Sequence, residues 1–133
     1  MRQAARVVLS IATGIVVALV LVVAVELFSA VVHPLPPDFG GTEEEMCAHV
    51  ERYPQWVLAA ATVLWGGTTF LSCAVAKRIG NRWSGLTVGL LLLAAVLFNV
   101  AKLPYPMWFK VITPALQGLI IVLNFRSPSP RHR

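Results

Sequence analysis

Charged residues are scarce in this chain of 133 residues: they make up 13% of it, against 57% for hydrophobic residues. In an ordinary soluble domain about a quarter of the residues are charged. The composition therefore argues against a soluble globular domain and indicates a protein embedded in a membrane. Too little chain lies outside its apolar stretches to form a separate catalytic domain, a nucleotide-binding fold or a repeat array.

Cysteine is nearly absent, since the chain has only Cys47 and Cys73. Two cysteines are too few for a disulfide framework or a thiolate metal site, and the Cys-X-X-Cys pair of redox enzymes does not occur. Glu45 and His49 lie four residues apart and share a helical face, but they offer only two ligands to a metal. We therefore expect no metal and no cofactor.

Patterns that indicate catalysis are also lacking. The sequence contains no nucleophile paired with a base, no pair of acids and no phosphate-binding loop, so we expect no enzymatic activity. The net charge of +5 could suggest a nucleic-acid partner. Its basic residues sit at the ends of apolar stretches, where they act as signals of membrane topology, and we expect no nucleic-acid binding.

Four long apolar stretches are the dominant feature that the chain does contain. Each can cross a hydrocarbon core about 30 Å thick, because a helix rises about 1.5 Å per residue. The sequence predicts an all-α integral membrane protein, a four-transmembrane-helix bundle that forms one domain over residues 7–126. The predicted spans are about 7–32, 55–76, 84–103 and 106–124.

Basic and acidic residues separate to opposite sides of this predicted bundle. The acidic residues other than Glu26 gather in the loop 33–54, whereas most basic residues lie at the other side. Because Lys and Arg in short loops stay cytoplasmic, we expect residues 1–6 and the tail 127–133 to be cytoplasmic and the loop to be outside. We expect the tail to be disordered, and the compact chain favours a prokaryotic cytoplasmic membrane. The basic residues on the inner side are Arg2, Arg6, Lys77, Arg78, Arg82, Arg126, Arg131 and Arg133.

The outer loop carries the pattern of a short amphipathic helix. Thr42 and Glu45 form a capping box, in which each side chain accepts a hydrogen bond from the other residue's backbone. Met46, Val50 and Tyr53 then share one face. We expect this helix to lie on the membrane surface or to cover the outer mouth of the bundle.

Small residues predict where the helices pack closely. Gly66 lies in a seam of small residues on the second span, and Gly85 and Gly89 form a GxxxG pair on the third. Without a hydrophobic driving force inside lipid, small residues promote helix association by letting backbones approach. We expect these three glycines to lie at helix contacts, Gly66 against another helix backbone.

Polar residues within the spans predict a candidate cluster near the outer surface. Glu26, Asn99, Lys102 and Lys110 all lie within about 10 Å of the outer ends of their helices. Polar groups in a bilayer face the protein interior or water, so these four can meet. One interpretation is that the lysines pair with Glu26 or reach the interface as structural features, while tyrosines and tryptophans at the span ends form an interface belt.

Two functions fit these observations. The first is a non-enzymatic membrane scaffold or interaction partner, bound to the lipid bilayer and to other membrane proteins or further copies of itself. The alternative is a small transporter or ligand-binding membrane protein that uses the cluster around Glu26. The two differ in a structural feature, because a scaffold has a filled, ion-paired core whereas a transporter or binding protein has a cavity that reaches Glu26.

Overall fold

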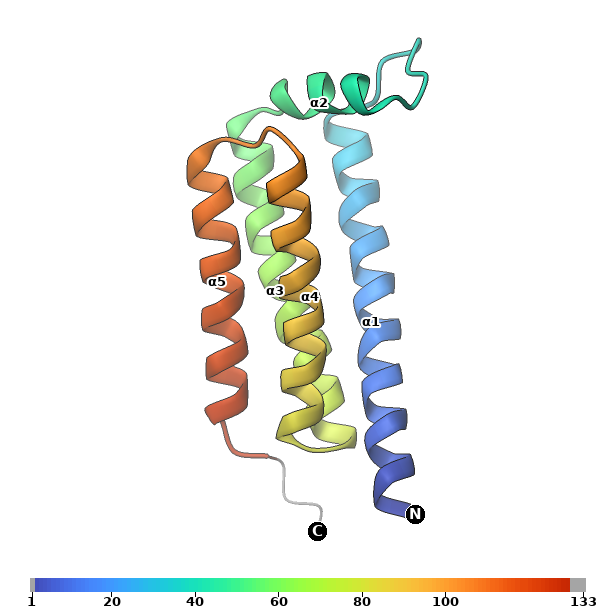
Figure 1. The fold of residues 1–133 in the computed structure, drawn as a ribbon, viewed down its shortest axis with the longest axis vertical. Coiled ribbons are helices and arrows are strands. Elements are labelled where there is room, and N and C mark those ends of the chain that lie inside the picture. The colour runs from blue at the N-terminus through green and yellow to red at the C-terminus, as the bar shows by residue number, and fades with distance from the viewer. Residues whose placement is uncertain (1, 130–133) are drawn as a thin grey trace.

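In the computed structural model the described residues, 2–129, form five helices (Figure 1). Four of them are long and apolar enough to cross a membrane, and the fifth is a short helix in the connection after the first. The prediction of an all-helical fold with four such helices is confirmed. The predicted disorder of the tail falls largely on residues 130–133, which lie outside the described residues. The helices are α1 Arg2–Val32, α2 Glu43–Glu51, α3 Gln55–Ile79, α4 Arg82–Lys102 and α5 Met107–Arg126.

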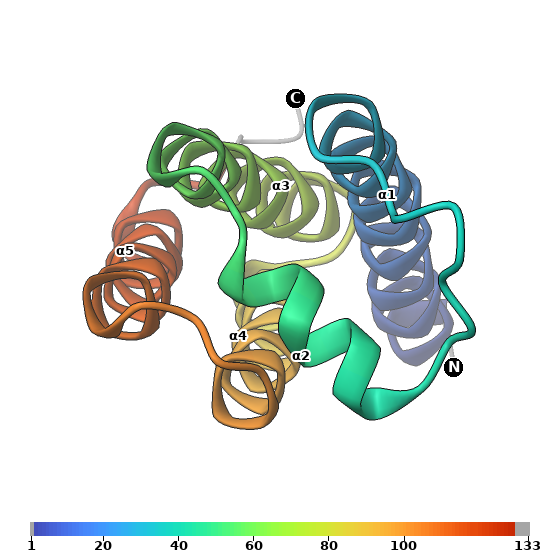
Figure 2. The same cartoon turned by 90° about the horizontal axis from the view of Figure 1, so that it is seen from above.

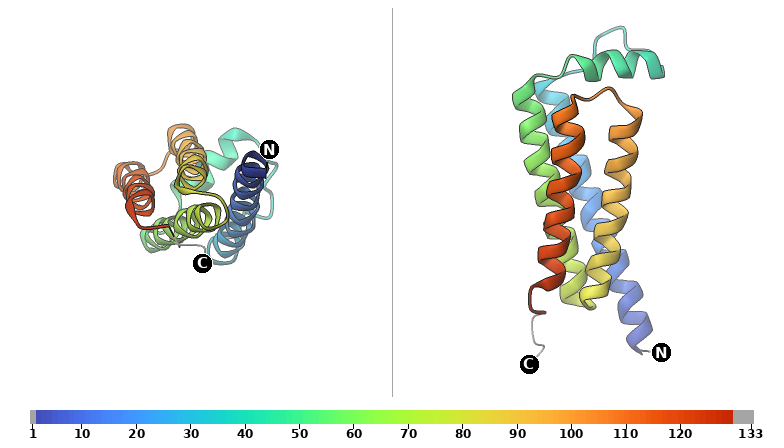
Figure 3. Two further views of the ribbon diagram at one scale, coloured as in Figure 1. Left: turned by 90° about the horizontal axis from the view of Figure 1, so that it is seen from below. Right: turned by 60° about the vertical axis from the view of Figure 1, so that its left-hand side comes forward.

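The long helices run alternately up and down, so α1 begins and α5 ends at the same end of the bundle (Figures 1 and 3). We call this the terminal end, and we call the opposite end, which α2 crosses, the α2 end (Figure 2). Helix α3 packs against all three other long helices, whereas α1 and α5 do not touch within the described residues. The bundle is therefore organised around α3.

The capping box at the start of α2 is present. The Thr42 hydroxyl accepts a hydrogen bond of 3.2 Å from the backbone N–H of Glu45, and the Glu45 carboxylate accepts one of 3.1 Å from Thr42. The same carboxylate accepts a bond of 2.9 Å from Gly40. These bonds, those with Thr42 foremost, lower the pKa of Glu45, and they fix the point at which the extended segment turns into α2.

Close packing of the four long helices in the terminal half of the bundle depends on glycine. A β-carbon at Gly14 would lie 2.9 Å from side-chain atoms of both Ala76 and Val88. One at Gly89 would lie 2.8 Å from Cγ1 of Ile121, and one at Gly85 would lie 2.8 Å from a backbone carbonyl oxygen of α3. All three distances are shorter than real β-carbon contacts, so these positions have no room for a side chain.

Gly66 lies at a looser contact than expected. A β-carbon there would meet Cδ1 of Ile120 at 3.1 Å and Cδ2 of Leu116 at 3.3 Å, both at the ends of side chains from α5. The nearest atoms therefore belong to flexible side chains of the neighbouring helix, rather than to the backbone that the seam predicts.

Candidate functional site

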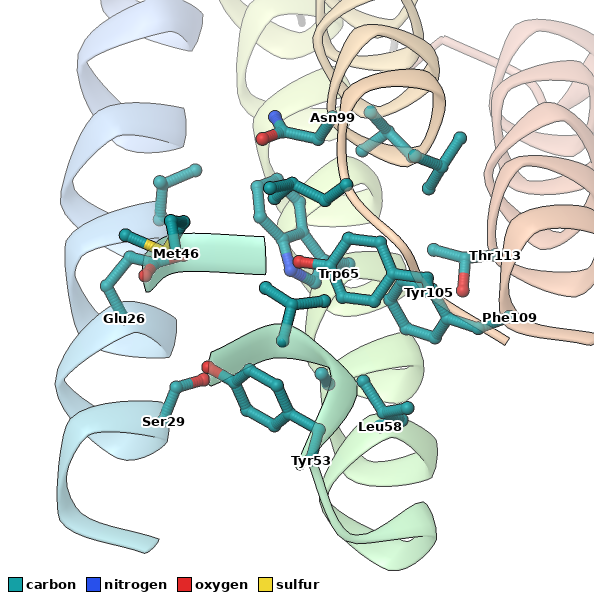
Figure 4. Close-up of a pocket in the computed structure, with 16 residues that line it drawn as sticks. Glu26, Ser29, Met46, Tyr53, Leu58, Trp65, Asn99, Tyr105, Phe109 and Thr113 are labelled. Atoms are coloured by element: carbon teal, nitrogen blue, oxygen red, sulfur yellow. The ribbon is translucent and has the colours of Figure 1, made fainter. Parts of the chain in front are cut away.

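The helices leave a cavity of about 530 Å³ at the α2 end of the bundle (Figure 4). All five helices contribute to its walls, and most of the lining is apolar, including Leu58, Ala61 and Val96. Leu58, Ala61 and Val96 also belong to a hydrophobic core cluster, so the wall that they form is well packed. The cavity therefore has a firm apolar side to which polar groups are added at a few points.

Helix α2 forms the roof of this cavity. Met46 and Val50 from α2, with Tyr53 just beyond its end, line the cavity from above. These are the three residues that the sequence places on one helical face. Of the two positions expected for this helix, the structure therefore has the one over the mouth of the bundle (Figure 2).

Glu26 and Asn99 lie at the same level on α1 and α4. The two helices touch at Gly14 and Val88 in the terminal half. Glu26 is 12 residues beyond Gly14 (26 − 14) and Asn99 is 11 beyond Val88 (99 − 88), which places each roughly 17 Å further along its helix. Both side chains line the cavity and both are exposed, so the cavity opens between α1 and α4 at their level.

The two lysines of the predicted cluster lie elsewhere. Neither Lys102 nor Lys110 lines the cavity, and the exposed Lys102 places its Nζ 5.8 Å from the ring centre of Phe98. In the described part of the chain no cation lies within 4.0 Å of the Glu26 carboxylate, and no hydrogen bond reaches it. Of the predicted cluster, the cavity lining thus contains Glu26 and Asn99, and within the described residues the Glu26 carboxylate has no ion pair.

Aromatic side chains make up much of the remaining wall. Tyr53, Trp65, Tyr105 and Phe109 line the cavity, with the rings of Tyr105 and Phe109 tilted against each other at 4.6 Å. Tyr105 comes from the α4–α5 connection (Figure 4). A hydrogen bond of 2.7 Å from Nε1 of Trp108, at the start of α5, to the side chain of Gln55 holds α5 against the start of α3. Two of the residues expected in an interface belt, Tyr53 and Tyr105, therefore line the cavity.

Glu26 contributes to a raised pKa of both cavity tyrosines. Burial raises the pKa of Tyr105 to about 12, with further contributions from Tyr53 and then Glu26. Burial and Glu26 also raise the pKa of Tyr53, while a hydrogen bond with Ser29 opposes the shift. Both hydroxyls consequently stay protonated at neutral pH, so the two tyrosines add no charge to the cavity.

Sequence reasoning found Glu26 and Asn99 but missed the aromatic wall. In the sequence, Trp65 and Phe109 look like ordinary apolar residues of their helices. Only counting residues from the helix ends, as for Glu26, could have placed them near the depth of Glu26. Within residues 2–129, no three histidine, cysteine or acidic side chains lie close enough to hold a metal ion. No protein-family model, curated protein or solved structure matches the chain. The chemistry of the cavity must therefore be inferred from its own residues.

Proposed function

We propose that this chain is an integral membrane protein that binds a small amphiphilic cation in the cavity beneath α2. The observation that carries this proposal is an unpaired carboxylate, Glu26, in a mostly apolar cavity of about 530 Å³. Small-molecule sites typically measure about 300 to 1,000 Å³ and combine apolar walls with a few well-placed polar groups. Of the two functions suggested by the sequence, the open cavity favours ligand binding over a scaffold with a filled core.

A positive charge is the ligand property that this cavity selects best. Glu26 offers an electrostatic partner, and the rings of Tyr53, Trp65 and Tyr105 offer aromatic surfaces. A cation over an aromatic face gains about 0.5 to 2 kcal/mol, with the larger values in poorly hydrated sites. The apolar wall around Leu58 and Val96 accepts the rest of the molecule. An amphiphile with a cationic group satisfies all of these surfaces at once.

The proposed placement in the membrane puts the α2 end outside. The four long helices cross the bilayer, the acidic first turn of α2 with Glu43 and Glu44 lies in the outer interface, and both termini are cytoplasmic. A prokaryotic cytoplasmic membrane remains our proposal for the location. In this orientation the opening between α1 and α4 faces the outer leaflet, where an amphiphile concentrates.

Cysteine labelling tests this topology. Cys47 on α2 is partly exposed and Cys73 is buried, so Cys47 is the expected site of reaction for a thiol reagent. In intact cells an impermeant maleimide should label Cys47, and in a Cys47→Ser variant it should fail to label a cysteine placed at Ser129. Labelling at position 129 with protection of Cys47 would invert the topology and move the cavity to the inner leaflet.

Photoreactive probes test the proposed binding. Two probes share a diazirine-bearing alkyl chain, one ending in trimethylammonium and the other in the uncharged tert-butyl isostere. In nanodiscs of the full chain we expect the ammonium probe to label cavity residues with about tenfold higher affinity, the equivalent of about 1.4 kcal/mol. Glu26→Gln should remove this preference, and Glu26→Asp, which keeps the charge, should retain most of it.

A matched pair of alanine substitutions controls for binding at the lipid-facing surface. Ala61 lines the cavity, whereas Ala59 on the same helix is exposed. Ala61→Phe should fill the cavity and reduce labelling by both probes, while Ala59→Phe should not. Labelling that is spread along the exposed faces and indifferent to Ala61→Phe would refute a binding cavity. Equal affinity of the two probes would instead refute the preference for a cation.

A further inference from the structure

Three aromatic side chains meet above the cavity, where the end of α1, the last turn of α2 and the α2–α3 connection come together. His33 directly follows α1, His49 lies in α2, and Tyr53 lies in the connection. The two imidazole rings are stacked with their centroids 4.2 Å apart, and the Tyr53 ring lies 4.4 Å from His33 and 5.4 Å from His49. We call these three residues the roof cluster.

The roof cluster joins α2 to the end of α1. Nε2 of His33 donates a hydrogen bond of 3.0 Å to the backbone carbonyl oxygen of His49. His49 is only 7% exposed, so its ring is held between its neighbours rather than in solvent. Tyr53, the third member, also lines the cavity. A change at the cluster therefore affects both the packing of α2 against the end of α1 and the cavity wall.

The surroundings of His49 oppose a positive charge on its ring. Burial, His33 and Arg52 all lower the pKa of His49 from its ordinary value of 6.5. His33, which follows α1, and Arg52, at the end of α2, are both basic residues. The acidic residues on the neighbouring elements are Glu45, one turn before His49 on α2, whose carboxylate caps that helix, and Glu26 of α1, whose charge acts on Tyr53. Protonation of His49 would place a positive charge against the His33 ring and beside Arg52.

The direction of the pH effect follows from this arrangement. In an open state, in which α2 has moved away from the end of α1, His49 takes up a proton near its ordinary pKa, whereas in the closed state its surroundings oppose protonation. The open state therefore binds more protons, and the closed state loses stability as the pH falls below about 6.5. Above that pH His49 is mostly neutral in both states, and the stacking and the hydrogen bond hold α2 in place.

We infer that the roof cluster is a pH-sensitive latch that holds α2 over the cavity at neutral pH and releases it in mild acid, when His49 becomes cationic. Release opens the cavity toward the outer aqueous phase. This inference relies on the proposed function for the consequence of opening, because a bound cation would then exchange faster. The latch itself depends only on the contacts among His33, His49 and Tyr53.

The distance between α2 and the end of α1 tests the latch without any ligand. Spin labels are attached to cysteines placed at Glu44 and Val31, both exposed, in a background with Cys47→Ser and Cys73→Ser. Double electron–electron resonance in nanodiscs then gives the distance distribution at about pH 7.5 and about pH 5. We expect one short distance at the higher pH and a second, longer population at the lower.

A variant that cannot become cationic at position 49 separates the latch from a general effect of acid. His49→Phe removes the titrating ring, keeps an aromatic ring to stack on His33 and keeps the backbone carbonyl that His33 contacts. It should retain the short distance at both pH values, whereas Glu51→Gln, which changes an exposed charge at the end of α2, should respond as the native sequence does.

A native distribution that does not change with pH would overturn the latch, as would an equal shift in His49→Phe. Because no ligand is present in this measurement, the latch can fail while the photoreactive probes still label the cavity. Conversely, a failure of the probes at neutral pH with an intact pH response would reject the proposed binding function alone.

Discussion

Replacing Gly85 by valine should lower the free energy of unfolding by about 3 kcal/mol, the upper part of the range for overpacking a closely packed interior. A β-carbon at this position would lie 2.8 Å from the carbonyl oxygen of Cys73 and 3.1 Å from Cβ of Lys77. The first of these atoms is backbone, which cannot rotate away as a side-chain end can. Helices α3 and α4 would therefore have to separate, which disturbs the contacts of α3 with the rest of the bundle.

The control for this substitution is Gly67→Val on α3. Nothing lies within 4 Å of a β-carbon at Gly67, so the same chemical change creates no clash there. Thermal unfolding in detergent, followed by circular dichroism, should show a much lower midpoint for Gly85→Val than for Gly67→Val. Similar midpoints would mean that α3 and α4 are not in close contact at Gly85.

The helices and the cap of α2 could be predicted because the signals for them are local. A long apolar stretch has few folding options in a membrane, and the Thr42–Glu45 spacing places two groups within reach of each other along one helical turn. The shared level of Glu26 and Asn99 also follows from counting residues at a fixed rise. These features depend on distance along a helix, which the sequence contains directly.

The direction in which a polar stripe faces could not be predicted in the same way. Spacings of three and four residues place Asn99 and Lys102 on one side of α4, but they do not fix the rotation of that helix in the bundle. The opening beside Asn99 depends on how far α1 stands from α4, and that separation is set by contacts at Gly14, about 18 Å from Glu26. The cavity and the unpaired carboxylate are consequences of this tertiary arrangement.

Helix ends were a second source of error, with consequences for Lys77. The sequence places Lys77 in the inner loop, as one of several topology charges. Helix α3 continues to Ile79, and the additional turn carries the Lys77 side chain into the bundle, where the residue is 5% exposed. A shift of three residues at a helix end thus changes a surface charge into a buried contact between α3 and α5.

The buried ammonium group of Lys77 should therefore contribute more to stability than its exposed neighbours do. Its Nζ donates hydrogen bonds of 2.6 Å to the carbonyl oxygens of Asn124 and Ser127, and one of 2.7 Å to the Ser127 hydroxyl. Carbonyl groups at a helix end have no partner within the helix, and a cation there also interacts favourably with the helix dipole. Lys77 thus completes the end of α5 from a neighbouring helix.

Lys77→Met should lower the free energy of unfolding by about 2 to 3 kcal/mol, because hydrogen bonds from a charged donor contribute about 1.5 to 3 kcal/mol and the carbonyls lose their partner. Methionine keeps most of the length of the side chain, so the loss of the charged donor is the main change. Arg78→Met is the control, since Arg78 is adjacent and exposed and should change stability by less than about 0.5 kcal/mol. Chemical unfolding of the three proteins in the same detergent measures the differences. Equal stability of Lys77→Met and Arg78→Met would show that water satisfies the end of α5 as well as Lys77 does.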